Sequence, residues 1–152
     1  MGLMEIVLRL VAATLIGGSI GLNRYLHHKS IGIRTLGLVA LVAAAMVVSV
    51  LEVSTTDSAT RVIQGIVTGI GFIGAGLIMH RPDDEQVHGL TTATTVWVAA
   101  AIGIMCGLGV WHVVLVAAAI VGLLLLFGGR FEKAIAMHYD KADDTTKNRD
   151  SD

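Results

Sequence analysis

The most constraining feature of this sequence is a stretch without Asp, Glu, Lys or Arg that runs through residues 89–129. A single helix over these residues would extend about 60 Å at ~1.5 Å per residue. The hydrocarbon core of a bilayer is about 30 Å thick, so the stretch predicts two membrane spans. The predicted break lies in CGLGVWH, residues 106–112, where two glycines loosen the helix and Trp111 suits the membrane interface.

Charge placement over the rest of the chain predicts three further spans. Charged residues make up 15% of the 152 residues and hydrophobic residues 54%, whereas a soluble domain carries roughly 25% charged residues. The apolar segments predict helices at residues 2–22, 33–51, 62–79, 90–107 and 110–128. The expected fold is therefore all-α: a polytopic integral membrane protein with five transmembrane helices in the lipid bilayer.

The positions of lysine and arginine predict how these spans are oriented. With the N-terminus outside, nine of the eleven Lys and Arg residues fall on the cytoplasmic side, and only Arg9 and Arg61 fall outside. We therefore expect residues 1–129 to form a transmembrane domain with its N-terminus out and its C-terminal end cytoplasmic. Residues 130–152 are expected to form a short cytoplasmic helix and then a disordered polar tail.

Glycines are concentrated in the third predicted span, where GIGFIG at residues 69–74 matches the G-x-G-x-x-G fingerprint of dinucleotide sites. That fingerprint also requires an acidic residue about 20 positions later, but residues 91–97 read TTATTVW. We therefore expect no nucleotide at residues 69–74. The glycine spacing instead favours close helix–helix packing and self-association in lipid. The glycines expected to act in this way are Gly17, Gly21, Gly65, Gly69, Gly71, Gly74, Gly76, Gly103 and Gly107.

Six charged residues at the predicted helix ends are candidates for ionic roles. Glu5 and Arg9 are four residues apart and share one helix face, where they can form an interfacial pair or a functional ionic site. Arg24 and Arg34 can each bind a lipid phosphate or cap a helix. The remaining two candidates are Asp57 and Arg61, beside the predicted outer loop.

A magnesium path would need oxygen ligands, because Mg²⁺ prefers them in octahedral geometry. None of the twelve acidic residues lies mid-membrane in the second to fifth spans, which counts against a carboxylate relay for ions. Hydroxyl and amide side chains can instead line a polar crevice, or they can bond to their own helix backbone. These residues are Asn23, Gln64, Thr68, Thr91, Thr92, Thr94 and Thr95.

The loop after the third span supplies weak metal-ligand candidates in Asp83, Asp84 and Glu85, which a solvated loop would also explain. Nothing in the sequence resembles a nucleophile with its base or a metal hydrolase site, so we expect no enzyme activity. No basic stretch suits a nucleic-acid backbone, and no cofactor is expected. Mg²⁺ is expected only as a transported substrate or as a signal, not as a cofactor.

Three segments together resemble the membrane domain of the MgtC/SapB family. They read GLNRYLHHKSIGIRTLGLVAL (21–41), RVIQGIVTGIGFIGAGLI (61–78) and HGLTTATTVWVAAAIG (88–103), and the resemblance runs from residue 5 to residue 128. Two positions depart from the family pattern. Asn23 stands where the family has an acid in G-L-E-R, and DSATR at residues 57–61 replaces D-P-x-R. The C-terminal soluble domain of many members is expected to be absent here.

The resemblance implies a multi-pass protein of the bacterial inner membrane with a role in magnesium homeostasis and survival at low magnesium. In pathogens it also implies growth inside macrophages. Two modes of action stay open. In one, the chain transports Mg²⁺ or another cation. In the other, it is a small regulator that modulates a partner, such as ATP synthase or another transporter, through helix–helix contact.

Overall fold

The computed structural model describes residues 1–27, 31–53, 56–80 and 87–147. In these residues, five helices are long and apolar enough to cross a membrane. Each predicted span overlaps one of them, so the all-α fold with five spans is confirmed, whereas the orientation of the termini stays a prediction. The helices are α1 (Leu3–Leu26), α2 (Ile33–Val53), α3 (Thr56–Leu77), α4 (Leu90–Leu108) and α5 (Trp111–Lys147).

Helices α1 and α3 extend further into polar sequence than predicted. Helix α1 continues past residue 22 to Leu26, because Arg24 in its last turn is buried against the neighbouring helices rather than left in water. Helix α3 begins at Thr56 instead of residue 62. Its first turn contains Asp57, and a negative charge there is favourable next to the positive end of the helix dipole.

A short antiparallel hairpin, which the sequence did not predict, links α3 to α4. Strand β1 (Met79–His80) pairs with β2 (Val87–His88), with Met79 opposite His88 and His80 opposite Val87. The hairpin leads directly into Gly89, whose φ of 88° is a left-handed conformation that glycine adopts without strain. The predicted metal-ligand candidates Asp83, Asp84 and Glu85 lie outside the described residues.

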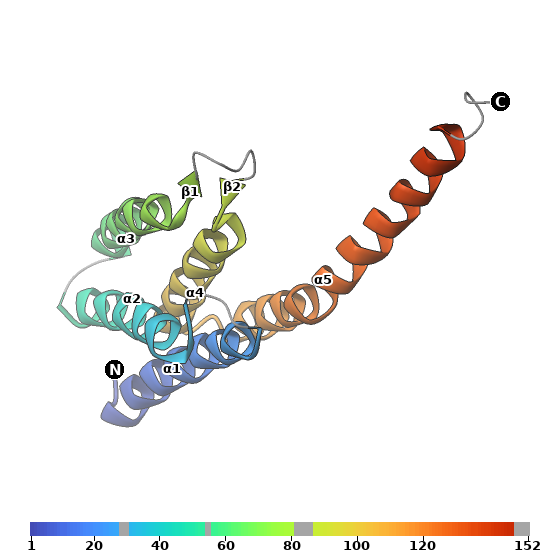
Figure 1. Cartoon of the computed structure of the whole chain (residues 1–152). Helices are drawn as coiled ribbons and strands as arrows, with labels where there is room; N and C mark the ends of the chain where they lie inside the picture. The colour runs from blue at the N-terminus through green and yellow to red at the C-terminus, as the bar shows by residue number, and fades with distance from the viewer. Residues whose placement is uncertain (28–30, 54–55, 81–86, 148–152) are drawn as a thin grey trace. The chain divides into compact units, whose positions relative to one another are not determined.

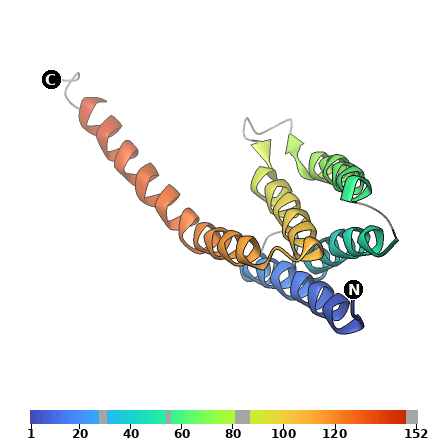
Figure 2. The ribbon, with the colours of Figure 1, turned by 180° about the vertical axis from the view of Figure 1, so that it is seen from behind.

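The chain divides into two compact units, residues 1–118 and residues 119–152. In the first unit, α2 and α4 lie at the centre: each packs against the other, and both contact α1 and α3. Figures 1 and 2 show this group of four helices from opposite sides. Helix α4 is the most enclosed span and α3 is largely exposed. Buried small residues such as Ala40, Ala44, Ala99 and Ala100 let the central helices approach closely.

Glycines bring α1 and α4 into backbone contact with α2. A Cβ added at Gly17 would lie 2.6 Å from the Ala40 Cβ, and one at Gly107 would lie 2.8 Å from the Val47 Cβ. Real Cβ atoms do not approach this closely, so these positions have no room for a side chain. Small residues therefore set the spacing of the bundle, as expected where helices pack without a water-driven hydrophobic force.

The second unit is the continuation of α5, which stays helical to Lys147. The span predicted at residues 110–128 corresponds to residues 111–129 of this helix. The helix passes through residue 129 and includes residues 143–147, which belong to the segment expected to be a polar tail. Extending an existing helix fixes one residue for each hydrogen bond gained, so α5 can continue into polar sequence without a new nucleus.

Candidate functional site

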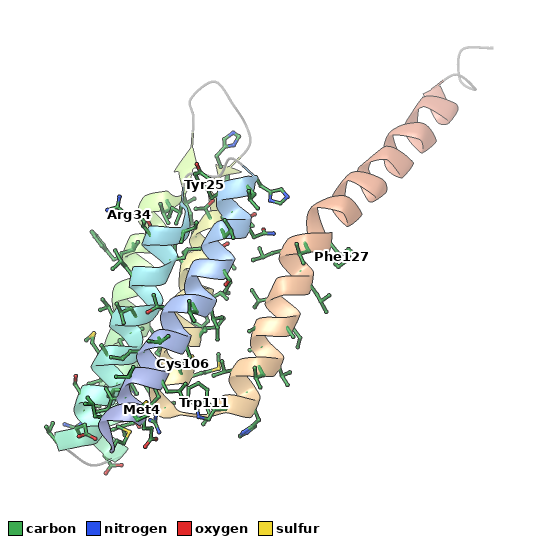
Figure 3. The ribbon with its side chains drawn as sticks, turned by 90° about the horizontal axis from the view of Figure 1, so that it is seen from below. Met4, Tyr25, Arg34, Cys106, Trp111 and Phe127 are labelled. Carbon is green, nitrogen blue, oxygen red and sulfur yellow. The ribbon has the colours of Figure 1, made fainter. Side chains whose placement is uncertain are left out.

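Two groups of polar contacts between different segments of the first unit lie at its opposite ends. Figure 3 shows Tyr25 and Arg34 at one end of this unit and Met4 and Trp111 at the other. The C-terminus of α1 and the N-terminus of α4 belong to the first end, because Arg24 contacts Thr92 there. We call the group of Arg24, Thr92 and the first turn of α4 the Arg24 site.

Arg24 is the buried charged residue of the described chain, with 6% of its surface exposed. Its Nη2 donates a hydrogen bond to the Thr92 Oγ1 at 2.7 Å, which joins the last turn of α1 to the first turn of α4. The Arg24 Nε is also buried and has no hydrogen-bond partner among the described residues. The site therefore holds a guanidinium in a poorly hydrated place with part of its donor capacity unused, a costly arrangement for a charged group.

The predicted polar crevice is only partly assembled. The structure buries Thr92 and Thr95 together with Arg24, whereas Gln64 and Thr68 lie exposed on α3. Asn23 is half-buried and Thr91 and Thr94 are exposed. Three of the hydroxyls donate to the carbonyl four residues back in their own helix: those of Thr68, Thr94 and Thr95. Among the predicted crevice residues, Thr92 is thus the one that accepts a hydrogen bond from another helix, donated by Arg24 of α1.

The opposite end of the first unit carries the second polar cluster. Arg9 forms an ion pair with Glu5, as the i, i+4 spacing predicts, and its Nη1 also donates to the Gly107 carbonyl oxygen at 2.6 Å. This places a positive charge at the C-terminus of α4, where the helix dipole favours it. The Met1 amino group donates to the Glu52 Oε1 at 2.5 Å, and this hydrogen bond raises the pKa of the amino group.

The link between Arg9 and α4 was not predicted. One signal for it is present in the sequence: Gly109 follows the last turn of α4, as glycine often does where a helix ends. In the structure the N–H groups of Gly109 and Val110 donate to the Cys106 and Met105 carbonyls, and Arg9 donates to the Gly107 carbonyl. The other predicted ionic residues remain on the surface. Arg34, Asp57 and Arg61 are exposed near the N-termini of α2 and α3.

The nine candidate packing glycines separate into three groups. Gly17, Gly21, Gly103 and Gly107 face backbone or Cβ atoms of neighbouring segments at distances that exclude a side chain. Gly74 is in ordinary contact range, with the Ala93 Cβ 3.8 Å from an added Cβ. On α3, an added Cβ would meet nothing within 4 Å at Gly65, Gly69, Gly71 and Gly76.

The structure also bears on the predictions about a nucleotide site and a metal site. Residues 69–74 lie within α3 and are helical throughout, so the G-x-G-x-x-G pattern is not a turn between a strand and a helix. Over the residues that the structure describes, no three His, Cys, Asp or Glu side chains come together as a metal-binding group.

Comparison with known proteins agrees with the family resemblance. The chain matches the MgtC family over residues 10–134. It is 48% identical over 100 residues to the protein MgtC of Brucella abortus (strain 2308), a match that covers 66% of this chain and 41% of that protein. It is 46% identical over 103 residues to the protein MgtC of Salmonella typhimurium (strain LT2), covering 68% of this chain and 43% of that protein.

The matched region spans about two fifths of the length of these relatives. No solved structure matches the chain. The family match nevertheless extends over most of the sequence, from within the first span through the whole of the fifth. This chain is therefore a multi-pass membrane protein that belongs to the MgtC family.

Proposed function

We propose that this chain serves magnesium homeostasis and low-magnesium adaptation at a bacterial inner membrane, and that it acts by binding a partner membrane protein through α3. The magnesium role follows from the family resemblance. The mode of action follows from two features of the first unit: the polarity of its interior and the outer face of α3. The transmembrane orientation with the N-terminus outside belongs to the same proposal.

The interior of the first unit is poorly suited to a divalent cation. Its buried polar and charged side chains, among the described residues, are Arg24, Thr92 and Thr95. A magnesium site normally includes one or two carboxylates, but Glu5 and Glu52 are exposed at the far end from Arg24. The guanidinium of Arg24 would repel Mg²⁺ from the hydroxyls beside it. These contacts favour a regulator over a conduction path.

The outer face of α3 is the observation that carries the proposal. Gly65, Gly69, Phe72 and Gly76 are spaced i, i+4, i+7 and i+11, so they lie on one side of the helix. Phe72 is 85% exposed, and an added Cβ at any of the three glycines would touch nothing. Each glycine costs a helix about 0.8–1 kcal/mol relative to alanine. Contact with another helix would offset that cost, because glycines allow a close approach.

The growth of cells in low-magnesium medium tests this role for α3. Gly69→Leu should abolish the growth that the wild-type chain supports in a strain lacking its own copy, while the amount of protein in the membrane stays unchanged. Gly122→Leu is the matched control, since an added Cβ at Gly122 on α5 also meets nothing within 4 Å. Normal growth with Gly69→Leu would refute the assignment of this face.

Magnesium transport is the second candidate, and a flux measurement separates the two. Purified protein in liposomes with a trapped Mg²⁺ indicator should give no more influx than empty liposomes. Saturable, protein-dependent influx would overturn the regulator and direct attention to Thr92 and Thr95.

A cross-linking experiment distinguishes binding of a different membrane protein to the outer face of α3 from self-association of this chain through the same face. Cys106 is buried, so a cysteine introduced by Phe72→Cys would be the exposed thiol of the described chain. Efficient cross-linking into a dimer of this chain in membranes would make the occupant of the face a second copy. Cross-linking to a different membrane protein, lost with Gly69→Leu, would make it a regulator of that protein.

A further inference from the structure

The positive charge of Arg24 is not balanced by any ion pair that the structure records in the described residues. Those ion pairs join Arg9 to Glu5 and the Met1 amino group to Glu52. Arg24 is only 6% exposed, its Nη2 donates to a neutral hydroxyl, and its Nε has no partner in the part of the chain that the structure describes. A buried guanidinium is stable only when an anion or several acceptors compensate the water it has lost.

The N-terminus of α4 adds positive potential at the same place. Helix α4 is 19 residues long and begins with Leu90, and Thr92 in its first turn is the residue that Arg24 contacts. Its N-cap is Gly89, which has no side chain to accept a hydrogen bond from the first-turn N–H groups. These groups have no acceptor within the helix, and the helix dipole is positive there. The guanidinium of Arg24 is thus joined by a hydrogen bond to the first turn of α4, next to the N-terminus of that helix.

The location is near one end of the membrane-length helices, where a membrane interface is expected. Arg24 lies in the last turn of α1, and the next residue, Tyr25, is 65% exposed. Tyrosine is enriched where lipid headgroups meet the hydrocarbon. Phosphate groups are present at this depth, both in lipid headgroups and in solutes that reach the surface.

We propose that Arg24 and the first turn of α4 bind a phosphate-bearing anion at this end of the first unit. A guanidinium offers a planar fork of donors that matches phosphate oxygens. A helix N-terminus offers backbone N–H groups to the same kind of anion. Thr92 positions the fork by accepting from Nη2. The proposal does not depend on the proposed function, since binding of an anion is measured on purified protein without a partner or a cation.

Arg34 provides a matched comparison within the chain. It is also an arginine, it lies near the same end, and it is in the first turn of α2, but it is exposed. Water screens an exposed guanidinium, so Arg34 should add little to specific binding. Arg24 and Arg34 therefore differ mainly in burial and in their relation to the N-terminus of α4.

The experiment is a ligand titration of the full chain in a neutral detergent, with the unfolding temperature followed by the fluorescence of Trp97 and Trp111. The probes are inorganic phosphate, dioctanoyl phosphatidylglycerol, dioctanoylglycerol as the phosphate-free control, and sodium chloride at matched ionic strength. At least one phosphate probe should raise the unfolding temperature with saturation, whereas dioctanoylglycerol and chloride should not. A response to phosphatidylglycerol alone identifies a lipid headgroup, and an equal response to inorganic phosphate identifies a free-phosphate site.

Binding measurements on arginine variants then test whether the anion binds at Arg24. Arg24→Gln should weaken the apparent Kd by at least about tenfold, the effect expected from losing charged hydrogen bonds, and Arg34→Gln should leave it nearly unchanged. If Arg24→Gln does not fold, Arg24→Lys keeps the charge but loses the planar fork, and it should still weaken binding. Equal weakening by both Gln variants would overturn the site.

An internal counterion is the competing explanation. If wild-type protein responds to neither phosphate probe, the proposal fails, whatever the variants do. If binding appears only after Asp83→Asn, Asp84→Asn and Glu85→Gln are combined, those loop acids already neutralise Arg24, and the site is not a ligand site in the native protein.

Discussion

Two adjacent glycines of α1 allow a sharp test of how the bundle is packed. At Gly17, an added Cβ would lie 2.6 Å from the Ala40 Cβ and 2.7 Å from the Leu36 carbonyl oxygen. These distances are 0.8 and 0.7 Å short of the 3.4 Å at which ordinary contact begins. At Gly18, the nearest atom is the Ile33 Cγ2, at an ordinary 3.7 Å. Alanine should therefore force α1 away from α2 at the first position and fit at the second.

The expected difference can be given a magnitude. Both substitutions gain the same helix propensity of about 0.8–1 kcal/mol, so comparing them cancels that contribution. What remains is the cost of overpacking, about 1–3 kcal/mol. Neither contact at Gly17 is the far end of a flexible side chain, so little local relief is available. A free-energy difference of about 1.4 kcal/mol changes an equilibrium constant tenfold. The open state, in which the first unit has come apart, should therefore be roughly 5- to 150-fold more populated in Gly17→Ala than in Gly18→Ala.

Cys106 supplies the assay, because it is the single cysteine of the chain and is fully buried on α4. Its rate of reaction with a small maleimide in detergent reports how often the first unit opens, provided that opening and closing are faster than labelling. Gly17→Ala should be labelled faster than Gly18→Ala by the factor given above. Equal rates for the two variants, or faster labelling of Gly18→Ala, would refute the view that glycine contacts set the spacing of α1 and α2.

The remaining predictions concern the two ends of α4. Arg9→Met should raise the free energy of the folded state by about 1.5–3 kcal/mol, because it removes a charged hydrogen bond to the Gly107 carbonyl, and Cys106 labelling measures this loss. Gly89→Ala should lower the unfolding temperature, since φ is +88° there and an added Cβ would collide with the Leu77 carbonyl oxygen. An unchanged unfolding temperature would show that the hairpin can move away from α3 without cost.

The fold was predictable because the bilayer restricts the choices. Backbone groups in hydrocarbon must be satisfied within each segment, so an apolar stretch of sufficient length has to be helical. The charge-free residues 89–129 accordingly appear as α4 and the first part of α5, with the break beside Gly109. The hairpin of β1 and β2 was missed because its strands have two residues each and no apolar pattern of their own.

The candidate site was less predictable, since it depends on which helices are neighbours. The i, i+4 pair of Glu5 and Arg9 could be anticipated because both residues are on one helix. The hydrogen bond from Arg24 to Thr92 joins residues 68 positions apart. No local pattern distinguishes Arg24 from Arg34, or Thr92 from Thr94, until α1 and α4 are in contact.

The sequence by itself determined the class of molecule, the number of membrane helices and the family, because hydrophobic length, charge placement and motif order are properties of the chain read in order. Only the tertiary structure decided which glycines join helices and which face outward, and which arginine is buried. Those properties depend on the distance between helices. Gly17 and Gly65 are the same residue in two membrane-length helices, yet Gly17 has no room for a methyl group, whereas a Cβ added at Gly65 would meet no described atom within 4 Å.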